Sequence, residues 1–491
     1  MNMEEMVAFT KGKGFFWPSA EIYGGYAGMY DYGHLGALLK RRFENAWVSY
    51  FVDGSSDYYL IDGSNVLPER PLVASGHAAR FNDTLVGCSK CHTYYRVDVL
   101  LAEHGVKSPE VAKPEEFDDL VKKNNVKCPK CKGALLPSKD FNMMIDVNLG
   151  PEKTDKGYLR PETAQTTYLN FFREFNALRK SLPMGLALIG RAYRNEISPR
   201  QGLYRLRELT QSELQIFFDP DSFKVPFDSL KGTEMNVVPF KTKKQERTTA
   251  ERMVKEYNIP EFYVYHMALI SEFYRKVIGM PEDKIRFLEK GGDEKAFYNR
   301  LHMDIEVDVE SWGGFREVGG LHYRGDYDLT CHTKGSNQDL AVTVNGKKVI
   351  PHVLELSFGV DRNVWMMVDV FYKTDGERKV LGLRPWLAPF SAAVLPLQKD
   401  DAIIAEAERI HKALRPHMKT FADQSGSIGR RYARMDEIGT PFCITVDFES
   451  VDNGSKNFGT VTIRDRDTKG QERVKIGNLA DILVPKARFS A

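Results

Sequence analysis

Charged side chains are concentrated in a segment that otherwise has the pattern of a buried β-hairpin. In IGRAYRNEISPRQGLYRLRELTQSELQIFF, two apolar, β-prone runs flank a turn of Ser, Pro, Arg, Gln and Gly. Strand alternation predicts that Arg194 and Glu196 share one face. By the same parity Arg205 and Arg207 lie together, with Glu213 on their side if the strand extends that far. Such a face suits a polyanion with hydrogen-bonding edges, and cross-strand ion pairs on a solvated hairpin are the alternative.

Three other stretches carry arginine and acidic residues in apolar surroundings: YLRPETAQ, GGLHYRGDYDL and VLELSFGVDR. Their charged residues include Glu162, Arg324, Glu355 and Arg362. Each has an ordinary explanation as a helix-capping acid, a turn former or a surface residue. A buried charge needs a partner, however, and one charged ligand could serve all four stretches. The sequence therefore predicts a polar site assembled from separated segments.

The cysteines predict a metal site. Cys88 and Cys91 form one C-x-x-C pair and Cys128 and Cys131 form another. Four thiolates with this spacing can close a tetrahedral zinc site, which leaves no open position for catalysis. We therefore favour a structural zinc ion over redox-active cysteines or coincidence.

Composition and length set broad limits on the protein. A chain of 491 residues is too long for one core, so three or four domains are expected. The net charge is only +2, so a nucleic-acid partner would be held by local basic patches. The N-terminus lacks the features of a signal peptide, and no apolar run is long enough for a membrane span. We expect a soluble, cytoplasmic protein.

The elements that must position these residues follow from periodicity. Residues 33–51 have the spacing of a packing helix, and the cysteine pairs lie in an insertion that holds a short helix, PEEFDDLVKK. Residues 221–300 are mostly helical in period, and strand patterns return over 301–370, with Asn345–Gly346 as a hairpin turn. The spacing of apolar residues predicts a helix after Gly359. Strands separated by insertions predict an α+β fold with an antiparallel sheet, followed by a C-terminal α/β domain. The predicted divisions are 1–85, 86–140, 141–220, 221–300, 301–386 and 387–491.

The motifs resemble a known family. YRNE is similar to the second signature motif of class II aminoacyl-tRNA synthetases, FGVDR resembles the third, and the helix and strand over 33–68 resemble the first. Within that class, EIYGG, RPETAQ, RNEISPRQGLYRLRE, DYDL and GRRYARMDEIGTPF resemble the homodimeric glycyl-tRNA synthetases. The resemblance implies a homodimer that joins glycine to ATP as glycyl-adenylate and transfers the glycyl group to tRNA(Gly).

The resemblance also implies which residues bind ATP. Arg194 and Arg362 would be the catalytic arginines, Arg205 would reach the outer phosphates and Glu196 would approach the adenine amino group. A bidentate guanidinium suits growing phosphate charge better than a lysine does. Glu317 would be a magnesium ligand. The remaining implied ATP contacts are Asn195, Tyr204, Leu206, Arg207, Glu208, Leu209, Val318, Gly359, Val360 and Asp361.

A glycine site must recognise an ammonium, a carboxylate and the absence of a side chain. By resemblance, Glu162, Glu213 and Glu355 bind the ammonium, and Arg324 binds the carboxylate. One methyl group is worth only about 1–3 kcal/mol, so alanine must be excluded by filling the pocket, with Ser357 as the candidate wall. The remaining implied contacts are Arg96, Leu209, Thr210, Gln211, Ser212, Leu356, Phe358 and Gly359.

One position departs from the family pattern, and the alternatives are of different classes. Leu209 stands where many relatives have phenylalanine, which leaves Arg362 as the surer partner for the adenine ring. Arg430, Arg431 and Arg434, on a predicted helix, suit phosphates and unstacked bases, or are an ordinary solvated face. The rival hypotheses are a synthetase for another small amino acid, a non-catalytic paralogue and a zinc-ribbon nucleic-acid binder.

Overall fold

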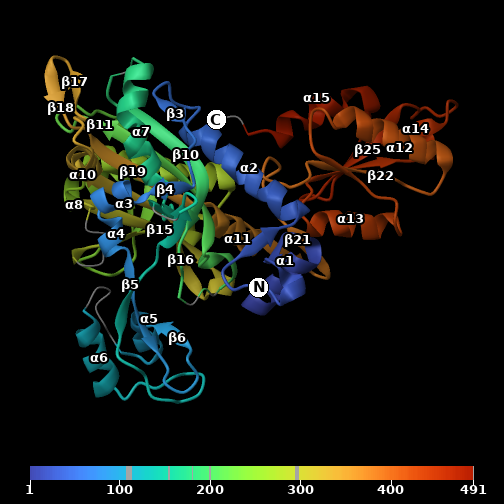
Figure 1. Ribbon diagram of the computed structural model, residues 1–491. Coiled ribbons are helices and arrows are strands. Elements are labelled where there is room, and N and C mark those ends of the chain that lie inside the picture. Colours follow the sequence, from blue (N-terminus) through green and yellow to red (C-terminus); the bar gives the residue numbers. More distant parts are fainter. Residues whose placement is uncertain are drawn as a thin grey trace.

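The computed structural model describes residues 1–106, 113–152, 155–179, 181–197, 199, 201–292 and 298–489. Figure 1 shows a central body built on one large sheet, a small lobe at one end that holds α5 and α6, and a separate C-terminal domain in orange and red. None of the described helices is both long enough and apolar enough to cross a membrane.

A mixed sheet organises the central body, and most of its strand pairs are antiparallel. Only the pairs β3–β10 and β12–β14 are parallel among the pairs recorded in this sheet. The antiparallel prediction therefore holds for the centre of the sheet. In spatial order the nine strands are β13 (Glu246–Thr249), β12 (Glu234–Val238), β14 (Ile285–Glu289), β15 (Leu301–Val309), β16 (Gly314–Gly325), β19 (His352–Gly359), β11 (Glu208–Phe218), β10 (Met184–Tyr193) and β3 (Tyr58–Leu60).

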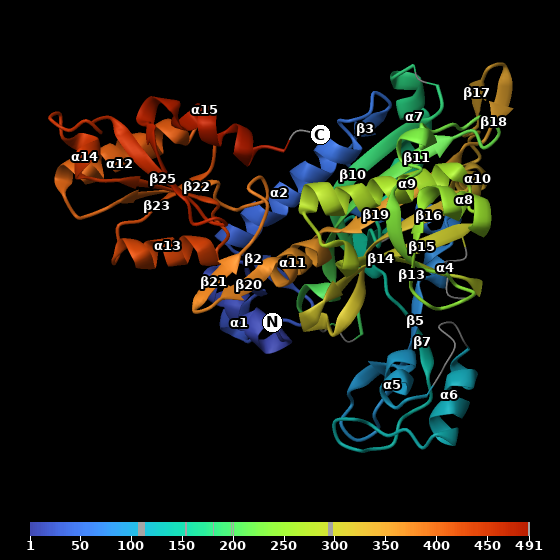
Figure 2. The same ribbon diagram turned by 180° about the vertical axis from the view of Figure 1, so that it is seen from behind.

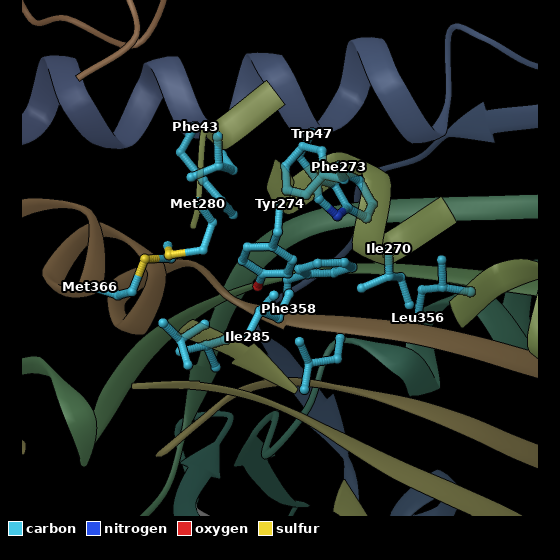
Figure 3. Close-up of a cluster of buried hydrophobic side chains, with 14 of the residues drawn as sticks. Phe43, Trp47, Ile270, Phe273, Tyr274, Met280, Ile285, Leu356, Phe358 and Met366 are labelled. Carbon is cyan, nitrogen blue, oxygen red and sulfur yellow. The ribbon is translucent and has the colours of Figure 1, made fainter. Parts of the chain in front are cut away.

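One face of this sheet carries the main apolar core. Alternation sends Leu214, Leu356 and Phe358 to this face, where they pack against α2 (His34–Phe51), α9 (Glu261–Glu272) and α11 (Val360–Phe371). Figure 3 shows Phe43 and Trp47 of α2 directed toward Phe358. This core fixes the strands that carry the polar residues of the opposite face.

The opposite face is covered only in part. There α7 (Ala164–Ala177) and α10 (Tyr327–Ser336) pack on the sheet, and the rings of Phe171 and Phe217 stack at 4.3 Å. Elsewhere on β11, Glu213 and Gln215 point to this same face and are also buried, but their partners are polar: Glu213 accepts from Thr163 and Gln215 donates to Glu355. The apolar cluster under α7 and α10 leaves this part of the sheet uncovered, and polar side chains collect there.

The charged hairpin differs from its prediction. Strand β10 ends at Tyr193 and β11 begins at Glu208, so Arg194, Glu196, Arg205 and Arg207 lie in the connection between the strands. The prediction that they share strand faces was wrong, because alternation applies only inside a strand. Ser198 and Arg200 of the predicted turn lie outside the described residues.

The prediction of a helical segment over 221–300 was half right. It contains α8 (Ala250–Tyr257) and α9, but also β12, β13 and β14, which form one edge of the main sheet. Short strands with mixed polar residues, such as EMNVV and ERTT, give a weak period-2 signal that the Lys/Glu-rich helices obscure.

The lobe with the four cysteines has its own small core. Val86, Val97, Leu101 and Phe117 are among its buried members. The prediction of a helix in PEEFDDLVKK is confirmed by α6. The lobe consists of β5 (Asn82–Gly87), β6 (Tyr94–Arg96), β7 (Lys139–Asn142), α5 (Val97–Glu103) and α6 (Pro114–Lys123).

The C-terminal domain is a separate α/β unit, best seen in Figure 2. Its apolar cores lie on both faces of the sheet, under α12 on one side and α13 on the other. In spatial order its strands are β23 (Thr420–Ala422), β22 (Ala392–Pro396), β24 (Phe442–Val446), β25 (Thr460–Asp465) and β26 (Gln471–Lys475). Its helices are α12 (Asp401–Leu414), α13 (Ile428–Glu437), α14 (Phe448–Val451) and α15 (Leu479–Leu483).

Buried polar contacts attach this domain to the central body. Arg466 donates to the backbone oxygens of Leu381 and Leu383 at 3.1 and 2.6 Å, and Arg378 donates to Asp436 at 2.8 Å. Arg431 of α13 is also buried and donates to Pro396 and Leu397. The predicted basic face of α13 is therefore only partly available, because Arg431 points inward.

Smaller elements complete the body. The predicted Asn345–Gly346 hairpin turn is confirmed, with φ values of 51° and 79°. These elements are α1 (Met3–Lys13), β1 (Phe16–Pro18), β2 (Tyr30–Tyr32), β4 (Val66–Pro68), α3 (Glu69–Ala74), α4 (His77–Arg80), β8 (Ile145–Leu149), β9 (Asp155–Leu159), β17 (Val342–Val344), β18 (Lys347–Val349), β20 (Tyr372–Asp375) and β21 (Arg378–Leu381).

Candidate active site

A polar cavity of about 170 Å³ lies over the uncovered part of the sheet. It joins the carboxylates of the sheet at one end to the arginines of the β10–β11 connection at the other. Its lining residues are Glu162, Arg194, Glu196, Leu203, Tyr204, Arg205, Leu206, Leu209, Thr210, Gln211, Glu213, Tyr298, Glu317, Gly319, His322, Glu355, Ser357, Gly359, Asp361 and Arg362. The sequence-separated segments with arginine and acidic residues thus meet at one place.

Strand register builds one end of the cavity. Ser357 of β19 is paired with Glu213 of β11 and with Gly320 of β16. Two residues further along, Glu355 is paired with Gln215 and with His322. Because residues i and i+2 share a face, these two rows present their side chains together.

Three carboxylates surround one guanidinium at this end. The Arg324 side chain is 1% exposed, and it donates to Asp328 from Nε at 2.8 Å and from Nη2 at 2.9 Å. Its Nη1 lies 3.3 Å from an oxygen of Glu355, and Nη2 lies 3.8 Å from Glu162. A further acid, Glu213, lines this end of the cavity together with Glu162 and Glu355. The acids outnumber the guanidinium, which leaves an environment suited to a small cation.

Hydrogen bonds fix the three cavity carboxylates. Glu213 accepts from Thr163 Oγ1 at 2.7 Å and from Ser357 Oγ at 2.9 Å. Glu355 accepts from Tyr168 at 3.0 Å. Glu162 accepts from Gln165 at 2.9 Å. Their positions are therefore set before any ligand arrives.

These environments shift the pKa values of the three acids in different directions. Burial, followed by the charges of Glu355 and Glu162, raises the pKa of Glu213 to about 8. Burial also raises the pKa of Glu355, although Arg324 opposes this shift. For Glu162, burial is outweighed by His77 and Arg324, which lower its pKa. Glu162 is the acid that stays ionised, and Glu213 is the one that holds a proton near neutral pH.

The other end of the cavity is cationic. The guanidinium of Arg362 lies 4.5 Å from the centre of the Tyr204 ring and forms an ion pair with Glu317 at 3.1 Å. Arg194 donates to the Pro161 oxygen at 3.1 Å, and Arg205 lies 3.9 Å from Glu196. Three guanidiniums face two carboxylates here, which suits a polyphosphate.

Several predicted residues lie outside the cavity lining. Ser212, Leu356 and Phe358 point toward the opposite face of the sheet, and Val318 and Val360 are fully buried in the apolar core. Arg207 donates to the oxygens of Ala27 and Glu196, and Glu208 pairs with Arg191. Asn195 is absent from the lining, and Arg324 acts on the lining acids from behind.

Arg96 lies in a neighbouring cavity of about 210 Å³ that it shares with Gln201 and Arg205. It pairs with Asp83 at 3.1 Å and with Asp98 at 2.7 Å. Arg96 thus lies on the lobe side of the β10–β11 connection, beside the cationic end of the main cavity and not among the acids.

Sequence reasoning missed several residues of the site. Gln215 could have been found, because it follows Glu213 by two residues in a strand. Asp328, in the motif DYDL, was interpreted only as a turn former, although it follows Arg324 by four residues at a helix start. His77, Tyr298 and His322 give no comparable local signal, since long-range packing brings them to the acids.

The four predicted metal ligands do converge. The sulfur atoms of Cys88, Cys91, Cys128 and Cys131 all lie within 4.8 Å of one another. The Cys88–Cys131 and Cys91–Cys128 distances are 3.4 and 3.6 Å, too long for disulfide bonds, which are about 2.05 Å. Four sulfur ligands in this arrangement fit a closed zinc site.

Comparison with known proteins agrees with this geometry. A model of the tRNA synthetase class II core domain (G, H, P, S and T) matches residues 147–236, and an anticodon binding domain model matches residues 391–486. The antiparallel sheet, its carboxylate and arginine site and the C-terminal domain therefore define a class II aminoacyl-tRNA synthetase.

Near full-length relatives give the particular family. The chain is 34% identical to the glycine–tRNA ligase of Thermococcus sibiricus, over 98% of each chain. It is 36% identical to that of Pyrococcus furiosus, over 96% of this chain and 97% of the relative. It is 35% identical to that of Methanothrix thermoacetophila, over 98% and 96%. The chain belongs to the glycine–tRNA ligase family.

Proposed function

We propose that the protein activates glycine with ATP and transfers the glycyl group to tRNA(Gly). A carboxylate oxygen of glycine attacks the α-phosphorus of ATP, and the bond to the β-phosphate breaks, giving glycyl-adenylate and pyrophosphate. A hydroxyl of the 3′-terminal ribose then attacks the glycyl carbonyl carbon and AMP leaves. The observation that carries this proposal is the cluster of acids beside three arginines, on a chain matched over nearly its whole length by glycine–tRNA ligases.

The acidic end would receive the ammonium of glycine. Ionised Glu162 supplies the permanent charge, and Glu355 and Glu213 complete the set of acceptors. The Nε and Nη2 atoms of Arg324 donate to Asp328 and Nη1 donates to Glu355, so the carboxylate contact implied by the resemblance would share Nη1 with Glu355.

The cationic end would receive ATP. Arg194 and Arg362 would neutralise the charge that grows on the α-phosphate, and such neutralisation is worth most in a water-poor site. Arg205 would contact the outer phosphates, and Glu196 would accept from the adenine amino group. The chemistry needs no protein nucleophile, because positioning and charge neutralisation suffice.

Glu317 is suited to act as a magnesium ligand. Its side chain is 43% exposed, and one carboxylate oxygen is paired with Arg362. Magnesium prefers oxygen ligands and is held by one or two carboxylates together with substrate phosphates. A bound ion would supply further charge neutralisation at the phosphates.

The cysteine lobe would hold a structural zinc ion through Cys88, Cys91, Cys128 and Cys131. The fit rests on the four converging sulfurs, two of which are buried in the small core of the lobe. We keep the division of the chain at 86, 141, 221, 301 and 387 as part of the same proposal.

Two partner surfaces belong to the proposal. The C-terminal domain would bind the anticodon of tRNA(Gly), as its family match implies. A second copy of the chain would cover the apolar surface around Leu60, which is 53% exposed, and the adjoining cavity lined by Tyr50, Phe51 and Tyr58. Light scattering after gel filtration tests for a dimer.

The decisive experiment is ATP–pyrophosphate exchange with glycine, alanine and serine compared. Glycine alone should drive exchange, and Glu213→Ala and Glu355→Ala should abolish it. The exposed acid Glu256, paired with Arg252 on α8, gives the matched control Glu256→Ala, which should exchange normally. Preference for serine would identify another small amino acid as substrate. Absence of exchange, together with tRNA binding, would favour a non-catalytic relative.

A further inference from the structure

A histidine that the family motifs do not include lies inside the acidic end of the cavity. His322 shares its cross-strand row with Glu355, and its Nε2 lies 4.0 Å from Glu355 Oε1. The side chain is only 16% exposed. The imidazole therefore belongs to the wall of the pocket that would receive glycine.

The position of the ring depends on a glycine two residues before it. A Cβ atom built on Gly320 would lie 2.4 Å from His322 Nε2 and 3.0 Å from Cε1. The ring thus occupies the space that any side chain at 320 would need. Gly320 is paired with Ser357, whose hydroxyl donates to Glu213, so the ring closes the sheet surface beside these two residues.

Contacts on the far side hold the ring in this place. Its Nδ1 lies 3.0 Å from the side-chain amide of the buried Asn299, within hydrogen-bonding distance. The ring of His302 packs against that of His322, with centroids 4.3 Å apart. The imidazole cannot swing away without breaking these contacts.

We infer that His322 is a specificity-determining residue, whose imidazole fills the space that the side chain of alanine or serine would occupy. This inference rests on the proposed function and adds to it the group that limits substrate size. Ser357, the wall expected from sequence, is engaged with Glu213 and forms only one side of the space.

The charge state of the imidazole ring suits this role. Burial, with smaller contributions from His302 and Arg324, lowers the pKa of His322 well below its usual value. A neutral ring fills volume beside an ammonium without repelling it, whereas a lysine or arginine there would compete for the acids. Steric exclusion is also what glycine selection requires, because a missing methyl offers nothing to bind.

The test compares three variants by ATP–pyrophosphate exchange with glycine and alanine. His322→Ala should raise kcat/KM for alanine relative to glycine by about 10- to 200-fold, the range for one methyl group in an apolar pocket. His322→Gln keeps a polar side chain of similar reach and should retain most of the selectivity. His352→Ala, a histidine of β19 outside the cavity lining, should leave the ratio at the wild-type value.

A second pair of variants separates exclusion from a general loss of structure. Gly320→Ala should lower kcat/KM for glycine, because its methyl forces the ring out of place. Gly320→Ala combined with His322→Ala should recover glycine activity, because the clash is gone. Melting curves show whether each variant is folded.

The outcomes distinguish the two levels of the proposal. If the wild-type protein shows no glycine-dependent exchange, the proposed function fails. If the wild type exchanges with glycine but a folded His322→Ala variant keeps the wild-type alanine-to-glycine ratio, only the role of His322 is overturned.

Discussion

The hydroxyl of Ser357 donates to Oε1 of Glu213 at 2.9 Å across the β11–β19 pair. Both residues lie on the same face of the sheet, and Thr163 donates to the other oxygen of Glu213 at 2.7 Å. The carboxylate is therefore fixed in place while two other acids lie close to it. Burial, followed by repulsion from Glu355 and Glu162, raises the pKa of Glu213, and the hydrogen bonds from Thr163 and Ser357 only partly oppose this shift.

Glycine binding should depend on the ionisation of Glu213. Its pKa of about 8 means that the free site is mostly protonated at neutral pH. An ammonium favours the ionised form, so kcat/KM for glycine in pyrophosphate exchange should rise with pH up to about 8 and then level off. Glycine binding at pH 7 should release protons, measurable by calorimetry in buffers of different ionisation enthalpy.

The raised pKa of Glu213 also affects the stability of the free protein. Stability should fall with rising pH, whereas glycine binding should improve. Folded Glu213 binds its proton up to about pH 8, whereas the unfolded residue releases it near the ordinary value of 4.5. Its contribution to the free energy of unfolding is therefore present below the unfolded pKa and is lost as pH rises through the folded pKa. Glu213→Gln should remove both effects. A wild-type profile for glycine that is flat from about pH 6 to 9 would contradict this account.

The role of Arg362 should depend on the planar shape of its guanidinium and not only on its positive charge. Its guanidinium stacks on Tyr204 and donates to the oxygens of Tyr204 and Glu317 at 3.0 and 3.1 Å. Arg362→Lys keeps the charge but loses the planar fork, so we expect exchange to fall by about 10²-fold or more, approaching the loss in Arg362→Ala.

Arg409→Ala is the matched control, because Arg409 is exposed on α12 and paired with Glu406. Its exchange rate should equal that of the wild type. Full activity in Arg362→Lys would show that a point charge suffices at this position.

The cysteine lobe should bind one zinc ion per chain. Cys128→Ser should lower the zinc content measured by mass spectrometry, because a closed site needs all four sulfurs. It should also expose the lobe to proteolysis between residues 82 and 142. Cys331→Ser changes a cysteine of α10, outside the cluster, and should keep both zinc and protease resistance. Equal zinc content in the two variants would refute the site.

Alanine substitutions of the neighbouring residues Arg430 and Arg431 in α13 should have different effects on stability and tRNA binding. Arg431 is 3% exposed and donates to the Pro396 and Leu397 oxygens, so Arg431→Ala should lower the melting temperature of the protein. Arg430 is exposed, and Arg430→Ala should leave the melting temperature unchanged while raising KM for tRNA(Gly), with exchange unaffected. The reverse pattern would mean that the contacts of Arg431 do not stabilise the domain.

The sequence by itself determined the features that depend on residues close to one another along the chain. Two C-x-x-C pairs predicted the cysteine cluster, Asn345–Gly346 predicted a hairpin, and the helix after Gly359 followed from apolar periodicity. Ordered motifs identified the family, and the comparisons support it.

Tertiary structure decided what depends on long-range register and burial. It showed that Arg194 and Arg205 lie in a connection rather than in strands, and that β12 and β14 join the sheet edge. It brought His322 over Gly320 beside Glu355. Local patterns cannot supply these facts, because the neighbours and the pKa of a buried side chain are set by strands that are distant in sequence, as Ser357 is from its partner Glu213.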